Sequence, residues 1–294
     1  MPSDCVPAAY GTNRWGISRW QIGNAARLKA ASLRSFGLDL LGFMRFRICI
    51  FLTALSVAGF FLTSPASMAP LFMLIPASFF LIANGYSLNS YADVKEDVAN
   101  GRNVSRFAGR RSGLLISSGF SVIGLAFCAF LGLLPTLAYL LLFAIGIFYS
   151  LLKLKNVFPI KNLYTGFGLP LLVVIGATVN APFSLALLLY YLLFSVFLTT
   201  VSLISDLRDF QGDKETGIRT VPVVLGYETA RRLIYALVLV FLALVMLFDV
   251  RALALLALAS FVMMFEIYRD FPLRAHTIGG YSMVALAVIM ALFA

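Results

Sequence analysis

Residues 183–213 read FSLALLLYYLLFSVFLTTVSLISDLRDFQGD. The first part of this stretch, 183–205, carries no charged side chain. A helix that crosses a bilayer needs about 17–25 mostly apolar residues, so this part is long enough to span. The last part carries three aspartates, Asp206, Asp209 and Asp213. The stretch therefore predicts a transmembrane helix that ends in a cluster of carboxylates.

The composition of the whole chain points to the membrane class. Of its 294 residues, 61% are hydrophobic and 12% are charged, whereas a soluble domain averages about 45–50% apolar and about 25% charged residues. We predict an all-α integral membrane bundle of nine transmembrane helices. The nine stretches that qualify run approximately over 44–63, 67–88, 112–131, 134–152, 163–179, 183–205, 231–248, 251–268 and 277–294.

The basic residues predict the orientation of the bundle. Alternate connections carry 22 of the 23 Lys and Arg residues, and only Arg251 lies on the other side. Because short cytoplasmic loops carry an excess of Lys and Arg, the N-terminus and the charged loops are expected in the cytoplasm. The membrane would be the plasma (inner) membrane in a prokaryote.

Residues 1–40 form a separate N-terminal segment ahead of the domain at 41–294. The segment is rich in Arg and contains Trp15 and Trp20. We expect part of it to be an amphipathic helix on the cytoplasmic surface. An organellar transit peptide, which is also Arg-rich and poor in acids, is the alternative.

Several classes of site are disfavoured by composition. Three widely spaced cysteines give no disulfide framework or CxxC site, and one histidine, His276, cannot build a multi-histidine metal centre. The formal charge of +10 favours contact with anionic lipid or an anionic substrate. Nucleic acid is not expected as a partner, because the basic residues lie between the spans.

Two carboxylate segments follow the second and sixth spans. Asn89, Asp93 and Asp97 are spaced i, i+4, i+8, and the three aspartates of 206–213 are spaced i, i+3, i+7. Each set would share one helical face, where like charges repel unless a cation neutralises them. Mg²⁺ commonly binds one or two carboxylates together with substrate phosphates. We therefore predict a Mg²⁺–diphosphate site; solvated helix ends are the alternative reading.

A third polar segment follows the fourth span. It contains Tyr149, Ser150, Lys153 and Lys155, and then Lys161-Asn162. These lysines could meet the remaining charge of a diphosphate. The alternative is that they are ordinary cytoplasmic loop lysines.

In order and spacing, these segments resemble the UbiA superfamily of intramembrane prenyltransferases. The resemblance covers about 40–294 and includes the Gly217-Ile-Arg-Thr-Val-Pro222 segment after the second motif. It implies that Asp93, Asp97, Asp209 and Asp213 bind two or more Mg²⁺ ions, or Mn²⁺. It also implies that Lys153 pairs with the diphosphate and that Tyr149 lines the site of the allylic cation. Further candidates for binding the diphosphate or supporting the metals are Asn89, Lys155, Asp206 and Arg47.

The chain departs from the family pattern in two places. Many members read Asn-Asp at the start of the first motif, whereas this chain reads Asn89-Ser90. Many members continue with Asn-Arg-Pro, whereas this chain reads Arg102-Asn103-Val104. The first departure leaves the metal spacing intact, and the second leaves the diphosphate contacts of that loop and the substrate subtype open.

The function implied by the resemblance is transfer of an isoprenyl chain from a prenyl diphosphate to an aromatic or lipid acceptor within the membrane. Phosphoribosyl transfer to a polyprenyl phosphate and a non-catalytic UbiA-like protein are the alternatives on the same fold. A CDP-alcohol phosphotransferase is disfavoured because its Asp-Gly start and Ala-Arg pair are absent. A transporter would place ionisable groups near the bilayer midplane, and the central stretches of spans two to six contain none.

Overall fold

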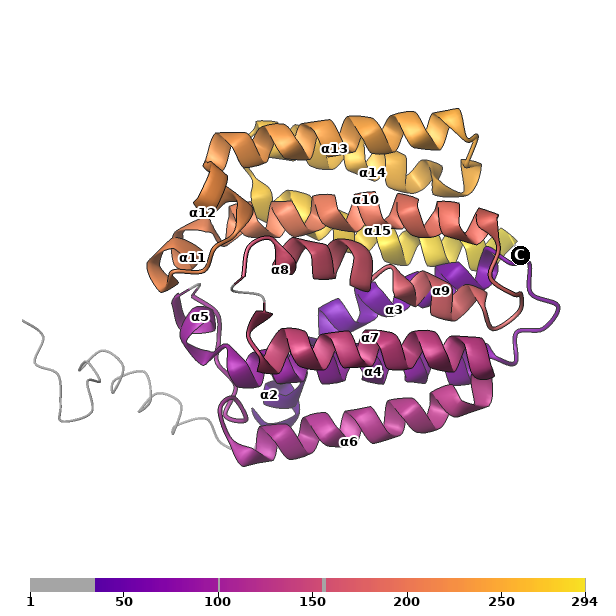
Figure 1. The fold of residues 1–294 in the computed structure, drawn as a ribbon, viewed down its shortest axis with the longest axis horizontal. Helices are drawn as coiled ribbons and strands as arrows, with labels where there is room; N and C mark the ends of the chain where they lie inside the picture. The colour runs from indigo at the N-terminus through magenta and orange to yellow at the C-terminus, as the bar shows by residue number, and fades with distance from the viewer. Residues whose placement is uncertain (1–34, 100, 155–156, 294) are drawn as a thin grey trace, which may run out of the picture.

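The computed structural model describes residues 35–99, 101–154 and 157–293, and in these ranges the regular elements are all helices (Figure 1). Eight helices are long and apolar enough to cross a membrane, and a bent pair at the start makes up to nine among the described residues. The predicted helical membrane bundle is thus confirmed. The eight segments are Leu71–Ala92 (α4), Arg111–Leu131 (α6, Arg111–Cys128, with η1, Ala129–Leu131), Leu133–Leu151 (α7), Ile160–Ala177, Leu185–Arg208 (α10), Tyr227–Leu247 (α13), Arg251–Tyr268 (η4, Arg251–Leu253, with α14, Ala254–Tyr268) and Pro272–Phe293 (α15).

The bent pair joins α2 (Ser35–Phe43) to α3 (Phe46–Phe61) at an angle of 51°. The bend falls at Arg45, whose φ of 51° is in the left-handed region. A left-handed residue cannot continue a right-handed helix, so the chain changes direction there. The predicted surface segment at 1–40 lies mostly outside the described residues; its described end, Ser35–Leu40, belongs to α2.

Helix α3 lies in the middle of the bundle and packs against α4, α15 and α9 (Leu171–Ala177). Most of its residues are buried, because it is apolar on every side and has neighbours on every side. The contact with α9 depends on small residues: a Cβ added at Gly59 would collide with the Val173 carbonyl, and one at Gly176 with the Ser56 carbonyl. Small residues allow helix backbones to approach this closely in a membrane.

The Gly- and Pro-rich fifth span is not a single α-helix. It begins as α8 (Ile160–Leu163), passes through one turn of π-helix, η3 (Tyr164–Gly168), and resumes as α9 after Pro170. A Cβ at Gly166 would collide with Thr199 of α10, so glycine permits the close packing of η3 on α10. Backbone irregularities of this kind are common at functional sites.

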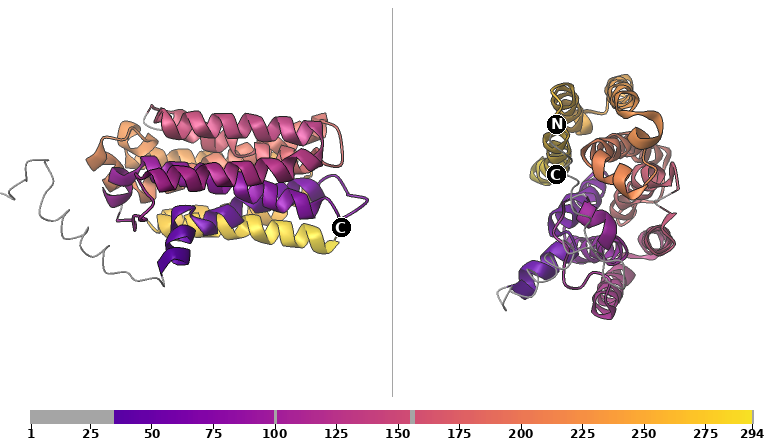
Figure 2. Two further views of the ribbon diagram at one scale, coloured as in Figure 1. Left: turned by 90° about the horizontal axis from the view of Figure 1, so that it is seen from below. Right: turned by 90° about the vertical axis from the view of Figure 1, so that its left-hand side faces the viewer.

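The two ends of the bundle differ in character. Three short helices, α5 (Val94–Ala99), α11 (Phe210–Thr216) and α12 (Val221–Leu225), lie at one end, which we call the polar end (Figures 1 and 2). The turns α6–α7, α9–α10 and α13–α14 lie at the other end together with the C-terminus.

The helices extend a few residues beyond the predicted apolar windows; α15, for example, begins at Pro272 rather than 277. Charged side chains can leave the apolar layer at a helix end, so they do not stop the helix.

Candidate active site

The two aspartate motifs are built alike. Asp93 is the C-cap of α4 and Asp209 the C-cap of α10, and in each case a short helix begins at the next residue. The helical hydrogen-bond pattern continues across each break. The amide of Asp97 donates to the Asp93 carbonyl, and the amide of Asp213 donates to the Asp209 carbonyl, both at 2.9 Å. Each predicted helical face is therefore interrupted at its middle aspartate, although the backbone hydrogen bonding continues across the break.

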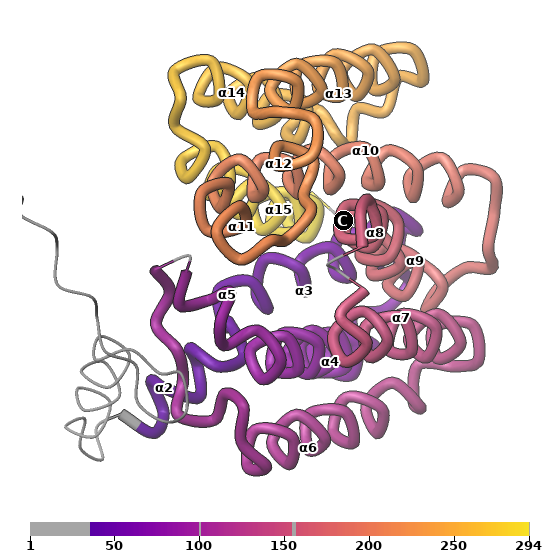
Figure 3. The backbone as a smooth tube through the Cα atoms, turned by 60° about the vertical axis from the view of Figure 1, so that its left-hand side comes forward, coloured from indigo at the N-terminus to yellow at the C-terminus, as the bar shows by residue number. Residues whose placement is uncertain are grey.

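The short helices also end alike. Gly101 and Gly217 both have positive φ, 65° and 74°. The amide of Arg102 then bonds the Asp97 carbonyl at 2.8 Å, and that of Ile218 bonds the Asp213 carbonyl at 2.9 Å. This is the Schellman pattern of helix termination, which glycine favours. The result is that α5 and α11 pack against each other at the polar end and bring the two motifs together (Figure 3).

Arginines connect the two motifs. Arg102 donates from Nη1 to Asp97 Oδ1 at 2.8 Å and from Nη2 to Asp209. Arg45 binds both carboxylate oxygens of Asp97, at 2.8 and 2.9 Å. Arg208 binds both oxygens of Asp209, each at 2.8 Å. The Arg208–Asp209 pair is bidentate, because two nitrogens bind two oxygens, and it fixes position as well as charge.

These contacts set the ionisation of Asp209. Burial opposes its charge, but the hydrogen bonds and charge of Arg208, with the charge of Arg102, outweigh burial and lower its pKa to about 2. Asp209 is therefore a carboxylate at neutral pH. A carboxylate is the form that binds a metal ion.

Lys161 connects two aspartates of the second motif, the fully buried Asp206 and Asp213. Its Nζ lies 2.7 Å from Asp206 Oδ1 and 3.5 Å from Asp213 Oδ2. Asn162 donates to the other oxygen of Asp206 at 2.8 Å, which completes the surroundings of a carboxylate that has no contact with solvent. The short helix α8 thus provides the cation and the amide that a buried charge requires.

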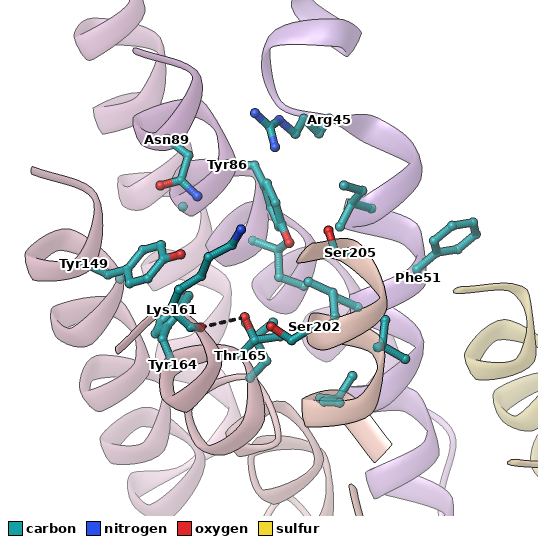
Figure 4. Close-up of a pocket in the computed structure, with 18 of the residues that line it drawn as sticks. Arg45, Phe51, Tyr86, Asn89, Tyr149, Lys161, Tyr164, Thr165, Ser202 and Ser205 are labelled. Carbon is teal, nitrogen blue, oxygen red and sulfur yellow. Dashed lines mark hydrogen bonds between the residues drawn. The ribbon is translucent and has the colours of Figure 1, made fainter. Parts of the chain in front are cut away.

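Aromatic rings line the site next to the charges. Tyr149 and Tyr164 stack with ring centroids 4.2 Å apart and planes at 20°. Figure 4 shows the Lys161 side chain extending from α8 between Tyr149 and Tyr86. Asn89 accepts a hydrogen bond from Ser150 at 2.8 Å, so its amide is held by α7.

These groups surround one cavity of about 200 Å³, which we call the main cavity. Its lining changes along its length. Carboxylates, arginines and Lys161 line the polar end, and aliphatic side chains from α3, α4, α7, α10 and α15 line the part farther inside the bundle. The aliphatic set includes Leu52, Ile82, Leu142, Leu198 and Met283. A cavity with this lining suits an amphiphile with an anionic head.

Most of the residues singled out from the sequence come together here, and two of the described ones do not. Asn89, Tyr149, Asp93, Asp97, Asp209 and Asp213 line the main cavity, and Asp206 is buried behind Lys161. Lys153 is exposed and outside the described lining, whereas Lys161 lines the main cavity. Arg47 is exposed and contacts Tyr281, whereas Arg45 reaches the site. Lys155 lies outside the described residues.

Sequence reasoning missed the arginines. The sequence did place Arg45, Arg102 and Arg208 near the motifs, since each is a basic residue at the end of a span or in the loop after a motif. His276 of α15 also lines the main cavity. What the sequence did not reveal is which of the many basic residues at this end point inward.

Carboxylate oxygens are suitable ligands for a hard divalent cation, but the described carboxylates do not form a complete metal site by themselves. Among the described residues, no three His, Cys, Asp or Glu side chains form a group that could hold a metal ion by themselves. Mg²⁺ keeps several waters and usually takes one or two carboxylates plus substrate phosphates. Buried aspartates on two facing motifs therefore fit an ion that is bound jointly with a phosphorylated ligand.

Comparison with known proteins identifies the family. The chain belongs to the UbiA prenyltransferase family, which matches residues 50–292. The digeranylgeranylglyceryl phosphate synthase of Haloquadratum walsbyi is 25% identical over 243 residues, covering 78% of this chain and 74% of that protein. The chain is thus an integral, multi-pass membrane protein of this family.

Solved structures share the fold. A UbiA homolog from Archaeoglobus fulgidus bound to GPP and Mg²⁺ matches with a TM-score of 0.69 at 17% identity, covering 86% of this chain and 99% of that one. The apo structure of a UbiA homolog from Aeropyrum pernix K1 matches with a TM-score of 0.67 at 20% identity, covering 83% and 98%.

Proposed function

We propose that this member of the UbiA prenyltransferase family transfers an isoprenyl chain from a prenyl diphosphate to an aromatic or lipid acceptor, with Mg²⁺ as cofactor. The observation that carries the proposal is the main cavity, in which a charged end continues into an aliphatic interior. A prenyl diphosphate has the same two parts in the same order. The Archaeoglobus fulgidus homolog, described as bound to GPP and Mg²⁺ and to DMAPP and Mg²⁺, supports this choice of donor.

In this proposal Asp93 and Asp97 of the first motif and Asp209 and Asp213 of the second hold the metal. Asp206 supports them through Lys161, which contacts both Asp206 and Asp213. Asn89, held by Ser150, lines the same cavity. When bound, Mg²⁺ supplies positive charge that stabilises the leaving diphosphate. The position of the motifs at one end of the cavity keeps the head of the donor there.

The cations of the site would face the diphosphate. Arg45, Arg102 and Lys161 bind the carboxylates that would hold the metal, so they are within reach of phosphate oxygens at the same place. Guanidinium groups match phosphate geometry in a bidentate manner. Lys153 and Lys155 remain candidates through the resemblance alone.

The aromatic pair would face the reacting carbon. An allylic cation that forms when the diphosphate leaves is attracted by the faces of aromatic rings within about 6 Å. Tyr149 and Tyr164 line the main cavity next to Lys161 (Figure 4). The chain's own residues would thus stabilise the cation while the aliphatic walls exclude water from it.

The acceptor would approach from the polar end, which we propose faces the cytoplasm. The relative from Haloquadratum walsbyi is a digeranylgeranylglyceryl phosphate synthase, and this favours a lipid acceptor. Aromatic acids remain open as the second class.

The test is purified protein with labelled geranylgeranyl or farnesyl diphosphate, Mg²⁺ and a panel of acceptors. We expect a prenylated product that disappears in EDTA and returns with Mg²⁺. A non-hydrolysable allylic thiodiphosphate should compete with the donor in a Mg²⁺-dependent manner. If it fails to bind while phosphoribosyl diphosphate binds, phosphoribosyl transfer is the correct reading.

A further inference from the structure

A second cavity lies beside the main cavity at the polar end. It measures about 220 Å³ and lies where α2, the start of α3, α4 and the loop after α5 meet. Arg45, Asp97 and Arg102 line both cavities, and they are joined to one another by the hydrogen bonds described above. The Arg45–Asp97–Arg102 group is therefore the boundary between two adjacent spaces.

The second cavity is basic. Arg45, Arg102 and Arg208 line it, and Asp97 is the one carboxylate among its described lining residues. Asp209, which pairs with Arg102 and Arg208, lines the main cavity instead. The arginines also keep donors that form no hydrogen bond within the described residues. Arg45, for example, donates to Asp97 through Nη2, and its Nε and Nη1 donate to no described residue. A guanidinium with available donors next to an open space is a binding site for an anion.

Both departures of this chain from the family pattern line this same cavity. Ser90 stands where many members have aspartate, and it faces the second cavity from α4. Asn103 and Val104 replace the Arg-Pro that follows in many members, and both also line it. A carboxylate at position 90 would cancel one of the arginine charges. Its replacement by a hydroxyl leaves the cavity cationic and adds a hydrogen-bond donor.

We infer that the second cavity binds the anionic head group of the acceptor and that Ser90 and Asn103 help to select it. The inference rests on the proposed prenyl transfer and specifies its second substrate. The head group is a phosphate monoester or a carboxylate, and the rest of the acceptor reaches past the Arg45–Asp97–Arg102 boundary toward the main cavity. Donor and acceptor would then occupy separate spaces that share one wall.

The first two variants test the effect of an added negative charge at the buried residue Ser90. Ser90→Asp places a carboxylate among the arginines, and Ser90→Asn is the neutral control of the same size. We expect Ser90→Asp to raise the KM of an anionic acceptor by about tenfold or more, while Ser90→Asn changes it by less than about threefold. The KM of the prenyl diphosphate should change by less than about threefold in both.

Because substitutions at the buried Ser90 can disturb folding, a second pair of variants tests the inference at an exposed position. Asn103 is exposed, so Asn103→Asp changes charge with almost no change in shape, and Asn103→Ala removes the amide without adding charge. Asn103→Asp should raise the acceptor KM several-fold, and Asn103→Ala should have a smaller effect. Mg²⁺-dependent binding of an allylic thiodiphosphate should be equal in all four variants and the parent chain.

Pairs of acceptors identify the head group. Geranylgeranylglyceryl phosphate is compared with the lipid without phosphate, and 4-hydroxybenzoate is compared with phenol. We expect an anionic acceptor to be preferred to its neutral partner, and the preferred pair shows whether the head is a phosphate or a carboxylate. Ser90→Asp and Asn103→Asp should reduce that preference.

Three results would overturn the inference. The first is an equal increase in donor and acceptor KM, which would assign the second cavity to the diphosphate. The second is an unchanged acceptor KM in Ser90→Asp and Asn103→Asp, and the third is a preference for neutral acceptors. Failure of the parent chain to bind the thiodiphosphate would instead refute the proposed prenyl transfer itself.

Discussion

Asp209 is held by two guanidinium groups at once, so its replacement is the sharpest test at the scale of single residues. Asp209→Asn keeps the size of the side chain but removes the charge that a metal needs. We expect turnover to fall by ~100-fold or more, as when an electrostatic stabiliser of a transition state is removed. Asp249→Asn, at the exposed opposite end, is the control. Near-parental rates in Asp209→Asn would mean that the carboxylate is only structural.

Lys161 offers a second residue-level prediction because it pairs with two buried carboxylates. Lys161→Met should destabilise the protein by about 3–5 kcal/mol, the usual cost of leaving a buried charge without its partner. It should also raise the KM of the donor. Lys214→Met, exposed on α11 at the same end, should do neither. Thermal unfolding in detergent measures the first effect, and equal melting temperatures for the two variants would contradict the prediction.

At the scale of elements, α3, which contributes Ile48 and Leu52 to the lining of the main cavity, packs closely against α9. Gly176→Ala places a methyl group against the Ser56 carbonyl, and a backbone atom cannot move aside as a flexible side chain can. We expect a loss of about 1–3 kcal/mol, as in other overpacked contacts. Gly119→Ala on α6 meets no atom within 4 Å and should be neutral or slightly stabilising. A Gly176→Ala protein as stable as the parent would show that the helices can separate at no cost.

At the scale of the whole molecule, the distribution of charge predicts which end faces the cytoplasm. Cytoplasmic loops favour Lys and Arg, so Lys214→Cys and Arg274→Cys should be labelled by an impermeant maleimide only after permeabilisation of intact cells. Pro182→Cys, at the other end, should be labelled without it. All three positions are exposed. A Cys5→Ser background removes the cysteine outside the described residues, and labelling of all three from one side would refute the orientation.

The sequence alone determined the membrane class, most of the spans and the two aspartate motifs that line one cavity. Long apolar stretches leave few alternatives to helices in a bilayer, because every backbone polar group must be satisfied within the chain. The aspartates at the ends of the second and sixth spans were recognisable because charge is rare in such a sequence. Asp93 and Asp209 could thus be assigned to one site before any contact was known.

Only the tertiary structure decided which cations serve that site. Arg45 and Arg47 are two residues apart, and at about 100° per residue two helical positions point to nearly opposite sides. The left-handed turn at Arg45 directs it toward Asp97 and leaves Arg47 beside Tyr281. Likewise Lys161, and not Lys153, reaches Asp206, because Lys161 lies on α8, which packs against α10. Periodicity describes the faces of one helix, whereas the choice between neighbouring cations depends on how separate helices pack against one another.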